Sequence, residues 1–424
     1  MNAEQPLRGR HLVTADRGFA TGAGVLARVL APGFRRVLDH IDAGLEHGAI
    51  EAVLPDGTRR LLGGHADGPI AIVELHSWRP LVRLMTSGSV GWYRGWAERE
   101  WSSPDPVPLF DLFMRNRAAL GEAGRARGLS RWLNWVKHAL RRNSRSGARR
   151  NIEFHYDLGN DFYAAWLDAT MSYSSARFAE PISDVEPLEL AQDRKIRGLL
   201  DRLALKPGDR LLEIGCGWGG LAEVAARDYG VHVTGITLSA EQKAFAEARM
   251  AKAGLSDRAD FRLTDYRDVA DRFDAVASVE MVEAVGEAYW PAYMEAIARV
   301  LKPGGRAAIQ FIDIDDAIFA NYATSADFIQ TYIFPGGMLI SESRFRAAAE
   351  GAGLAWQKLD RFGLHYAETL RRWRLRFDAA VEKGALPAGF DEAFVRLWRY
   401  YLMYCEGGFR GGGIDVAQIT LVRG

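Results

Sequence analysis

The chain has 424 residues, and its 54 lysine and arginine residues balance 54 aspartate and glutamate residues, so the formal net charge is zero. This balance argues against a globally basic nucleic-acid-binding protein. Two cysteines, Cys216 and Cys405, are too few for a disulfide framework or a zinc site. The N-terminus lacks the apolar core of a signal peptide, and no run approaches the ~20 apolar residues of a membrane span. We therefore expect a cytoplasmic protein without a metal, which would work on a membrane only from its surface.

Residues 1–120 mix short helical and strand-like patterns. Apolar residues recur at helical spacing in 27–41, two strands flank a Pro-Asp-Gly turn in 48–64, and 68–78 reads as a further strand. No cluster of catalytic residue types occurs here. The region is predicted to form a small α+β domain.

The segment 121–150 has a different composition, with no acidic residue between Ala123 and Ile152. Its basic residues are Arg125, Arg127, Arg131, Lys137, Arg141, Arg142, Arg145, Arg149 and Arg150, and its apolar residues are Trp132, Leu133, Trp135, Val136 and Leu140. The near-helical spacing favours a basic amphipathic helix, which suits an anionic membrane surface. An interdomain linker with a solvated basic face is an equal alternative, and nucleic acid is a weaker one.

Residues 151–424 alternate apolar strand-like runs with helical stretches. The strand-like runs are 209–217, 231–239, 259–266, 273–281 and 305–312, and helical stretches between them include 219–228, 240–253 and 287–301. Strands that alternate with helices predict a parallel sheet covered on both faces.

A glycine-rich loop follows the first of these strands and opens a helix. Its residues are Glu213, Gly215, Gly217 and Gly219. Glycines permit positive φ and close backbone approach to a ligand, and the loop lies at a carboxyl strand end, where doubly wound sheets bind ligands. A dinucleotide site expects an acidic residue ~20 residues later. The second strand instead ends near Thr237 and Gln242, which argues against NAD.

The third strand ends in Asp265 and Tyr266, an acid and an aromatic that suit the amino group and ring face of adenine. Together with the glycine loop, this pattern resembles class I methyltransferases that bind S-adenosylmethionine. A Rossmann-like domain for another nucleoside ligand is the alternative.

Several segments are similar to the cyclopropane fatty acid synthase family, in order and over roughly 150–424. They are FHYDLGNDFYAAWLDATMSYSSARF (154–178), SVEMVEAVG (278–286), YIFPGG (332–337), RFGLHYAETLRRW (361–373) and YYLMYCEGGFRGGGID (400–415). The resemblance implies a Rossmann-like fold with a mostly parallel seven-stranded sheet. It also implies transfer of a methyl group from S-adenosylmethionine to the double bond of an unsaturated acyl chain in membrane phospholipid. Residues 1–120 and the basic segment resemble, more weakly, the lipid-binding extension of the bacterial phospholipid-acting members.

The resemblance also implies roles for residues that bind the methyl donor. Tyr173 and Ser174 match positions that hold the methionine carboxylate. Gly215, Gly217 and Gly219 form the loop that begins at Glu213. Thr237 and Gln242 match the ribose side, and Asp265 and Tyr266 match the adenine side.

In this family a bicarbonate ion is thought to accept the final proton, held by a cysteine, a glutamate, a histidine, a backbone isoleucine and a tyrosine. The matching glutamate, isoleucine and tyrosine are Glu283, Ile312 and Tyr366, but the cysteine position is Ser175 and the histidine position is Gln310. These departures make bicarbonate a doubtful cofactor. Loss of a proton from a neighbouring chain carbon would give a methylated alkene or a methylene branch, so ring closure stays open.

Glu283 is the best remaining general base in this interpretation. His365, beside Tyr366, is a weaker alternative. Neither Ser174 nor Ser175 lies in a G-x-S-x-G elbow, which argues against a serine hydrolase.

The leading prediction is a lipid methyltransferase, peripheral at the inner face of the membrane and monomeric or homo-oligomeric. A methyltransferase for a soluble small molecule and a non-enzymatic lipid-binding protein are the alternatives.

Overall fold

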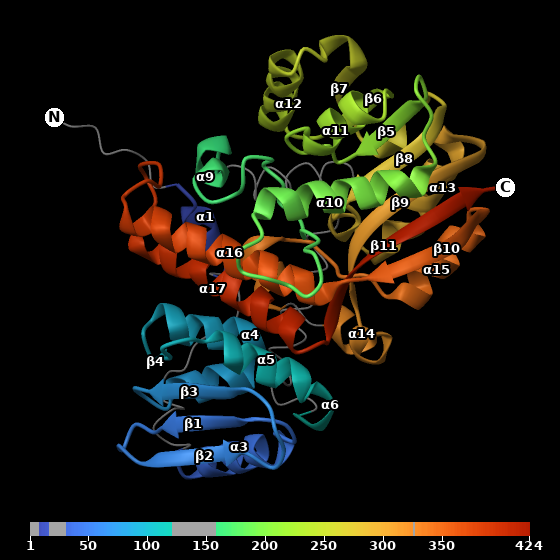
Figure 1. The fold of residues 1–424 in the computed structure, drawn as a ribbon. Helices are drawn as coiled ribbons and strands as arrows, with labels where there is room; N and C mark the ends of the chain where they lie inside the picture. The colour runs from blue at the N-terminus through green and yellow to red at the C-terminus, as the bar shows by residue number, and fades with distance from the viewer. Residues whose placement is uncertain (1–7, 17–30, 121–157, 325–326) are drawn as a thin grey trace. The chain divides into compact units, whose positions relative to one another are not determined.

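The computed structural model describes residues 8–16, 31–120, 158–324 and 327–424, which form two compact units (Figure 1). The first unit comprises 1–141, 317–335 and 388–414, and the second comprises 142–316, 336–387 and 415–424. Both units are therefore discontinuous, whereas the sequence pattern predicts consecutive domains. The basic segment 121–150 lies outside the described residues. Its helical structure and the domain boundaries at its two ends therefore stay predictions.

The first unit contains a four-stranded sheet in the order β2-β1-β3-β4. Its strands are β1 (Ala49–Val53), β2 (Arg59–Gly63), β3 (Ile70–Leu75) and β4 (Trp101–Ser102). Strands β1 and β2 pair antiparallel around the predicted Pro-Asp-Gly turn, and β1 pairs parallel to β3. The helices of this unit are α1 (Arg10–Val13), α3 (Ala31–Gly44), α4 (Arg79–Ala97), α5 (Val107–Arg115), α6 (Arg117–Leu120), α14 (Asp316–Ala323), the π-helical η6 (Ile329–Ile333) and α17 (Glu392–Arg410).

The second unit is built on a seven-stranded sheet in the order β10-β11-β9-β8-β5-β6-β7. Its strands are β5 (Arg210–Ile214), β6 (His232–Thr237), β7 (Ala259–Leu263), β8 (Phe273–Val279), β9 (Leu301–Ile314), β10 (Leu354–Arg361) and β11 (Ile414–Arg423). The pairs β5–β6, β5–β8, β6–β7 and β8–β9 are parallel, whereas β10 and β11 pair antiparallel. The predicted class, a mostly parallel seven-stranded α/β sheet, is confirmed.

Helices cover both faces of this sheet. Successive side chains of a strand point to opposite faces, so neighbouring positions on one strand pack against different helices. On β9, Ala308 packs in a buried cluster with Leu199 of α10 (Leu188–Leu200) and Leu221 of α11 (Gly220–Asp228). Phe311, three residues on, packs on Phe345 of α15 instead. The helices are α9 (Asn160–Ala164), α10 (Leu188–Leu200), α11 (Gly220–Asp228), α12 (Ala240–Lys252), α13 (Trp290–Val300), α15 (Glu342–Gly351) and α16 (Gly363–Glu382).

Short 3-10 turns join several of these elements: η1 (Asp201–Leu203), η2 (Ser256–Arg258), η3 (Tyr266–Asp268), η4 (Val282–Ala284) and η5 (Glu287–Tyr289). Among the helices within the described ranges, none is both long and apolar enough to cross a membrane.

Candidate active site

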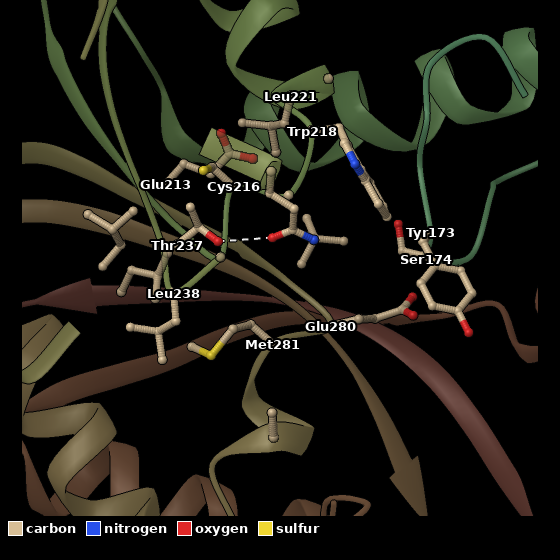
Figure 2. Close-up of a pocket in the computed structure, with 18 of the residues that line it drawn as sticks. Tyr173, Ser174, Glu213, Cys216, Trp218, Leu221, Thr237, Leu238, Glu280 and Met281 are labelled. Carbon is tan, nitrogen blue, oxygen red and sulfur yellow. Dashed lines mark hydrogen bonds between the residues drawn. The ribbon is translucent and has the colours of Figure 1, made fainter. Parts of the chain in front are cut away.

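A cavity opens in the second unit at the carboxyl ends of β5, β6, β7 and β8 (Figure 2). It is lined by nine of the predicted donor-binding residues: Tyr173, Ser174, Glu213, Gly215, Gly217, Thr237, Gln242, Asp265 and Tyr266. The structure therefore gathers residues from four strand ends and from the segment before α10. The wall also contains residues that the sequence did not single out: Lys195, Trp218, Leu238, Arg267, Glu280 and Met281.

The glycine loop needs its glycines for conformation and for space. Gly215 has φ +81°, and a Cβ there would lie 2.7 Å from Cγ of Met281. Gly219 has φ +80°, directly precedes α11, and a Cβ there would lie 2.9 Å from Cβ of Ala246. Gly219 thus supports the loop from beneath rather than lining the cavity. A side chain at either position would strain the backbone, and at Gly215 it would also displace Met281 of the cavity wall.

Glu213 is a buried carboxylate near the end of β5. It is 4% exposed, and among the described residues its Oε2 has no hydrogen-bond partner. Burial raises the pKa of Glu213 to about 8, although Lys195 nearby opposes the rise. A buried oxygen without a partner is costly, so a cationic group bound in the cavity would satisfy it. The ammonium group of S-adenosylmethionine has the required charge.

Tyr173 and Ser174 line the same cavity and have well-defined contacts. Lys195 donates from Nζ to Oγ of Ser174 at 2.8 Å, and burial lowers the pKa of this lysine to about 8. The ring of Tyr173 packs at 5.6 Å from Trp166 and 5.4 Å from Trp373. The predicted clamp on the methionine end is therefore packed between two tryptophans and hydrogen-bonded to a lysine.

The opposite end of the cavity is polar and aromatic. Thr237 donates from Oγ1 to Oε1 of Gln242 at 2.9 Å, which directs the amide nitrogen of Gln242 as a donor (dashed line in Figure 2). Asp265 accepts two hydrogen bonds from the guanidinium of Arg267, at 2.7 and 2.6 Å, and one from its backbone N–H at 3.0 Å. Tyr266 packs edge-on against Tyr293 at 5.3 Å. These polar and aromatic side chains fit a ribose and an adenine, so the cavity as a whole fits S-adenosylmethionine.

The predicted catalytic positions lie behind this cavity, and three of them converge on Glu280. The backbone N–H of Ser175 donates to Oε1 of Glu280 at 2.8 Å, and Gln310 donates from Nε2 to the same oxygen at 2.7 Å. Tyr366 donates its hydroxyl to Oε2 at 2.6 Å. Ser175 thus contributes its backbone, because its own hydroxyl donates to the carbonyl of Ala176.

Glu283, the glutamate taken from the family motif, makes a different contact. Its Oε1 accepts from the backbone N–H of Ile312 at 2.5 Å. Burial, and then the nearby charge of Glu280, raises the pKa of Glu283 to about 8. The two carboxyl groups are therefore close enough to compete for ionisation. The family-derived role of Glu283 stays a prediction.

The other candidate residues have structural contacts. His365 accepts from the backbone N–H of Phe178 at its Nδ1 and lies 2.8 Å from Glu180 at its Nε2, so both ring nitrogens are engaged. Cys216 is buried in an apolar cluster of this unit, and burial raises its pKa well above the ordinary value. These contacts favour packing roles for both.

Glu280 is the main residue that the sequence interpretation missed. A signal was present, because SVEMVE carries a glutamate directly after a buried strand, where catalytic side chains of such sheets gather. The family motif drew attention to the second glutamate of the pair instead.

The chain is similar to known proteins over most of its length. The profile of the mycolic acid cyclopropane synthetase family matches residues 143–419. Tuberculostearic acid methyltransferase UfaA1 of Mycobacterium tuberculosis is 39% identical over 417 residues, which is 95% of this chain and 92% of that protein. Cyclopropane-fatty-acyl-phospholipid synthase of Escherichia coli K12 is 37% identical over 64% of this chain and 67% of its own length.

Solved structures show the same fold. The cyclopropane synthase MmaA2 of Mycobacterium tuberculosis superposes with a TM-score of 0.60 at 28% identity, covering 65% of this chain and 98% of that chain. Mycolic acid cyclopropane synthase CmaA1, in complex with SAH and CTAB, gives a TM-score of 0.60 at 31% identity and the same coverage. The chain belongs to the mycolic acid cyclopropane synthetase family and is an S-adenosylmethionine-dependent methyltransferase of the cyclopropane fatty acid synthase type.

Proposed function

We propose that this enzyme methylates the double bond of an unsaturated acyl chain in membrane phospholipid and leaves a methyl-branched or methylene product. The observation that carries this proposal is the buried carboxyl pair of Glu280, which lines the donor cavity, and Glu283, which lies beyond its lining. The names of two relatives support the substrate class, since one is a tuberculostearic acid methyltransferase and the other a fatty-acyl-phospholipid synthase. Ser175 and Gln310 at the cysteine and histidine positions support branching over ring closure.

The residues around the cavity supply the conditions that this reaction needs. When bound, S-adenosylmethionine supplies an electrophilic methyl group on a sulfonium. Glu213 and Ser174 fix the methionine end, while Gln242 and Tyr266 hold the nucleoside. Because an alkene is a weak nucleophile, accurate positioning away from water matters more here than for an amine acceptor. The aromatic ring of Tyr366 next to the carboxylates can stabilise a developing cation.

The decisive test combines the purified enzyme with S-adenosylmethionine and vesicles of monounsaturated phosphatidylglycerol. We expect the acyl chains to gain one CH2 by mass spectrometry. Proton NMR then separates the products, because a ring gives upfield cyclopropyl signals and a branched product keeps a vinyl or methylene signal. Cyclopropyl signals would overturn branching. Methyl transfer to soluble acids or amines, with none to the vesicles, would establish the soluble-acceptor alternative.

We further propose that the enzyme works as a peripheral protein at the cytoplasmic face of an anionic membrane. The support is the run of nine basic residues with interleaved tryptophans in 125–150. Weaker binding to anionic vesicles, after four of these arginines are neutralised, is the expected result.

A further inference from the structure

Glu280 has an unusual backbone conformation at the carboxyl end of a central strand. It follows the last residue of β8, and its φ is +47°, in the left-handed region that residues other than glycine rarely adopt. Its backbone N–H donates to the carbonyl of Gln310 at 2.8 Å, which holds that conformation. Backbone strain that the surroundings hold in place is concentrated at functional sites. The conformation turns the carboxylate toward the cavity wall near Tyr173 and Ser174 (Figure 2).

The hydrogen bonds to Glu280 do not occupy all the lone-pair positions of its carboxylate. An ionised carboxylate offers about four lone-pair positions. Ser175 and Gln310 fill two positions on Oε1, and Tyr366 fills one on Oε2. One position on Oε2 is left by these three contacts, and Glu280 lines the cavity that fits the methyl donor.

Further hydrogen bonds orient the side-chain amide of Gln310. Gln310 is fully buried and accepts from Nε2 of Gln418 at 3.0 Å. Gln418 also donates to the backbone carbonyl of Lys195 at 3.2 Å. These contacts fix which end of the Gln310 amide faces Glu280, so a donor rather than an acceptor meets the carboxylate.

We infer that the Glu280 carboxylate is the built-in proton acceptor of the reaction and stands in place of a small bound anion. Its donors are the groups at three positions where the family resemblance implied bicarbonate ligands, and the fourth such group, the N–H of Ile312, is bonded to Glu283. The inference rests on the proposed methylation of an alkene.

In this step the alkene π pair forms the new carbon–carbon bond while the sulfur–methyl bond breaks, and the sulfur keeps that bonding pair. The acyl chain is left with a carbocation. Loss of a proton from an adjacent carbon, or from the methyl group after a hydride shift, returns the C–H pair to the chain as a double bond. The proton passes to Oε2 of Glu280 and later to solvent.

The test uses Glu280→Gly, which removes the carboxylate and suits the positive φ, so the variant is expected to fold. We expect kcat on the phospholipid vesicles to fall by about 10²–10⁴-fold, the usual contribution of a general base. Binding of S-adenosylhomocysteine, measured by calorimetry, should change far less. Formate or bicarbonate added to Glu280→Gly should restore part of the rate, whereas the wild type should run equally fast in carbonate-depleted and bicarbonate-supplemented buffer.

The matched control is Lys358→Gly on β10. Lys358 is exposed and has the same φ of +47°, so this variant relieves the same backbone conformation away from the cavity. It should keep wild-type activity. Full activity of Glu280→Gly without added anion, or a wild type stimulated by bicarbonate, would overturn the inference alone. A wild type that binds S-adenosylhomocysteine but methylates no unsaturated phospholipid would instead overturn the proposed function.

Discussion

At the scale of single residues, the site depends on charges that the fold leaves in apolar surroundings. Glu213 and Lys195 are nearly inaccessible to solvent, and burial shifts the pKa of each toward its neutral form. Such groups reduce the stability of the ligand-free protein, and they gain interaction partners when the ligand binds. This arrangement is a common source of conflict between stability and function.

Glu213→Gln should separate those two effects. The pKa of Glu213 in the folded protein is about 8, above its ordinary value of 4.5, so the unfolded chain ionises first. Stability is therefore lost as pH rises from about 4.5 to about 8. Without the donor at pH 8, the variant should have a higher melting temperature than the wild type, by roughly 2–4 °C for each kcal/mol of unfavourable ionisation that is removed. At pH 4.5 the two proteins should have about the same melting temperature. The same difference in melting temperature between variant and wild type at pH 4.5 and at pH 8 would contradict this explanation.

The same variant should bind S-adenosylmethionine more weakly. A hydrogen bond to a charged group contributes about 1.5–3 kcal/mol, so we expect a loss of about 10- to 150-fold in affinity by calorimetry. Unchanged affinity would show that Glu213 does not contact the donor.

Glu283→Gln should distinguish the two carboxyl groups. The pKa of Glu283 is raised to about 8, so below that pH it is mostly protonated and neutral. An amide can still accept from Ile312, so the variant should keep at least a third of the wild-type kcat at pH 7. Above pH 8 the wild type gains a negative charge beside Glu280, and the pH–rate profiles of the two should diverge there. Loss of activity at pH 7 would make Glu283 the base.

Most of the residues predicted to bind the donor line one cavity, because most of them stand at or just after a strand end; their roles stay predictions. Thr237 and Asp265 need only the order of the strands to be placed. Glu280 and Glu283 could not be ranked in this way. They lie close together in the sequence, and the positive φ of Glu280 and the start of the turn η4 at Val282 decide which carboxyl reaches which donor.

At the scale of elements, the turn from β5 into α11 is the most constrained part of the site. Gly215 combines a positive φ with a crowded Cβ position against Met281. Gly254, after α12, has φ +70°, and a Cβ added there would meet no atom within 4 Å. The two glycines therefore separate the conformational cost of a side chain from its steric cost.

Gly215→Ala should lower the free energy of unfolding more than Gly254→Ala does. The control should lose about 1 kcal/mol from strain alone. At Gly215 the clash with Met281 adds to that loss and narrows the cavity, so donor affinity should fall as well. Chemical denaturation and calorimetry measure the two effects. Equal losses, with affinity unchanged, would show that Met281 moves aside easily.

The elements show where prediction from sequence stops. Five parallel strands were recognised from their apolar runs, because strands buried on both faces have a simple pattern. The antiparallel pair β10 and β11 was not, since α16 and α17 both lie between them in the sequence and β10 is largely exposed. The sequence pattern places the residues of α17 in the methyltransferase domain. In the structure α17 packs on α5, and a Cβ on Gly407 of α17 would lie 2.7 Å from the carbonyl oxygen of Val107.

At the scale of the whole molecule, a formal charge of zero conceals an uneven distribution. Nine positive charges fall in 125–150 without an acid among them, so the remainder of the chain is acidic by the same amount. Local charge of this kind is what an anionic membrane recognises, because attraction decays within a Debye length of about 8–10 Å. Total charge is therefore a poor guide to membrane binding here.

A pair of equally charged variants tests this point. The first changes Arg141, Arg142, Arg149 and Arg150 to Gln, and the control changes the exposed lysines Lys206, Lys252, Lys358 and Lys383 to Gln. Each basic residue near an anionic surface contributes about 1 kcal/mol, so the first variant should lose at least tenfold in sedimentation with phosphatidylglycerol vesicles.

The control should bind the vesicles as the wild type does, since its lost charges are scattered. Raising the salt concentration should weaken the wild type toward the level of the first variant. Equal binding by both variants would identify 121–150 as a linker instead. Activity toward a short-chain, detergent-dispersed phospholipid should then be alike in all three proteins, because the chemistry of the cavity does not depend on these arginines. A loss confined to vesicles would therefore place the basic segment in delivery of the substrate rather than in the methyl transfer itself.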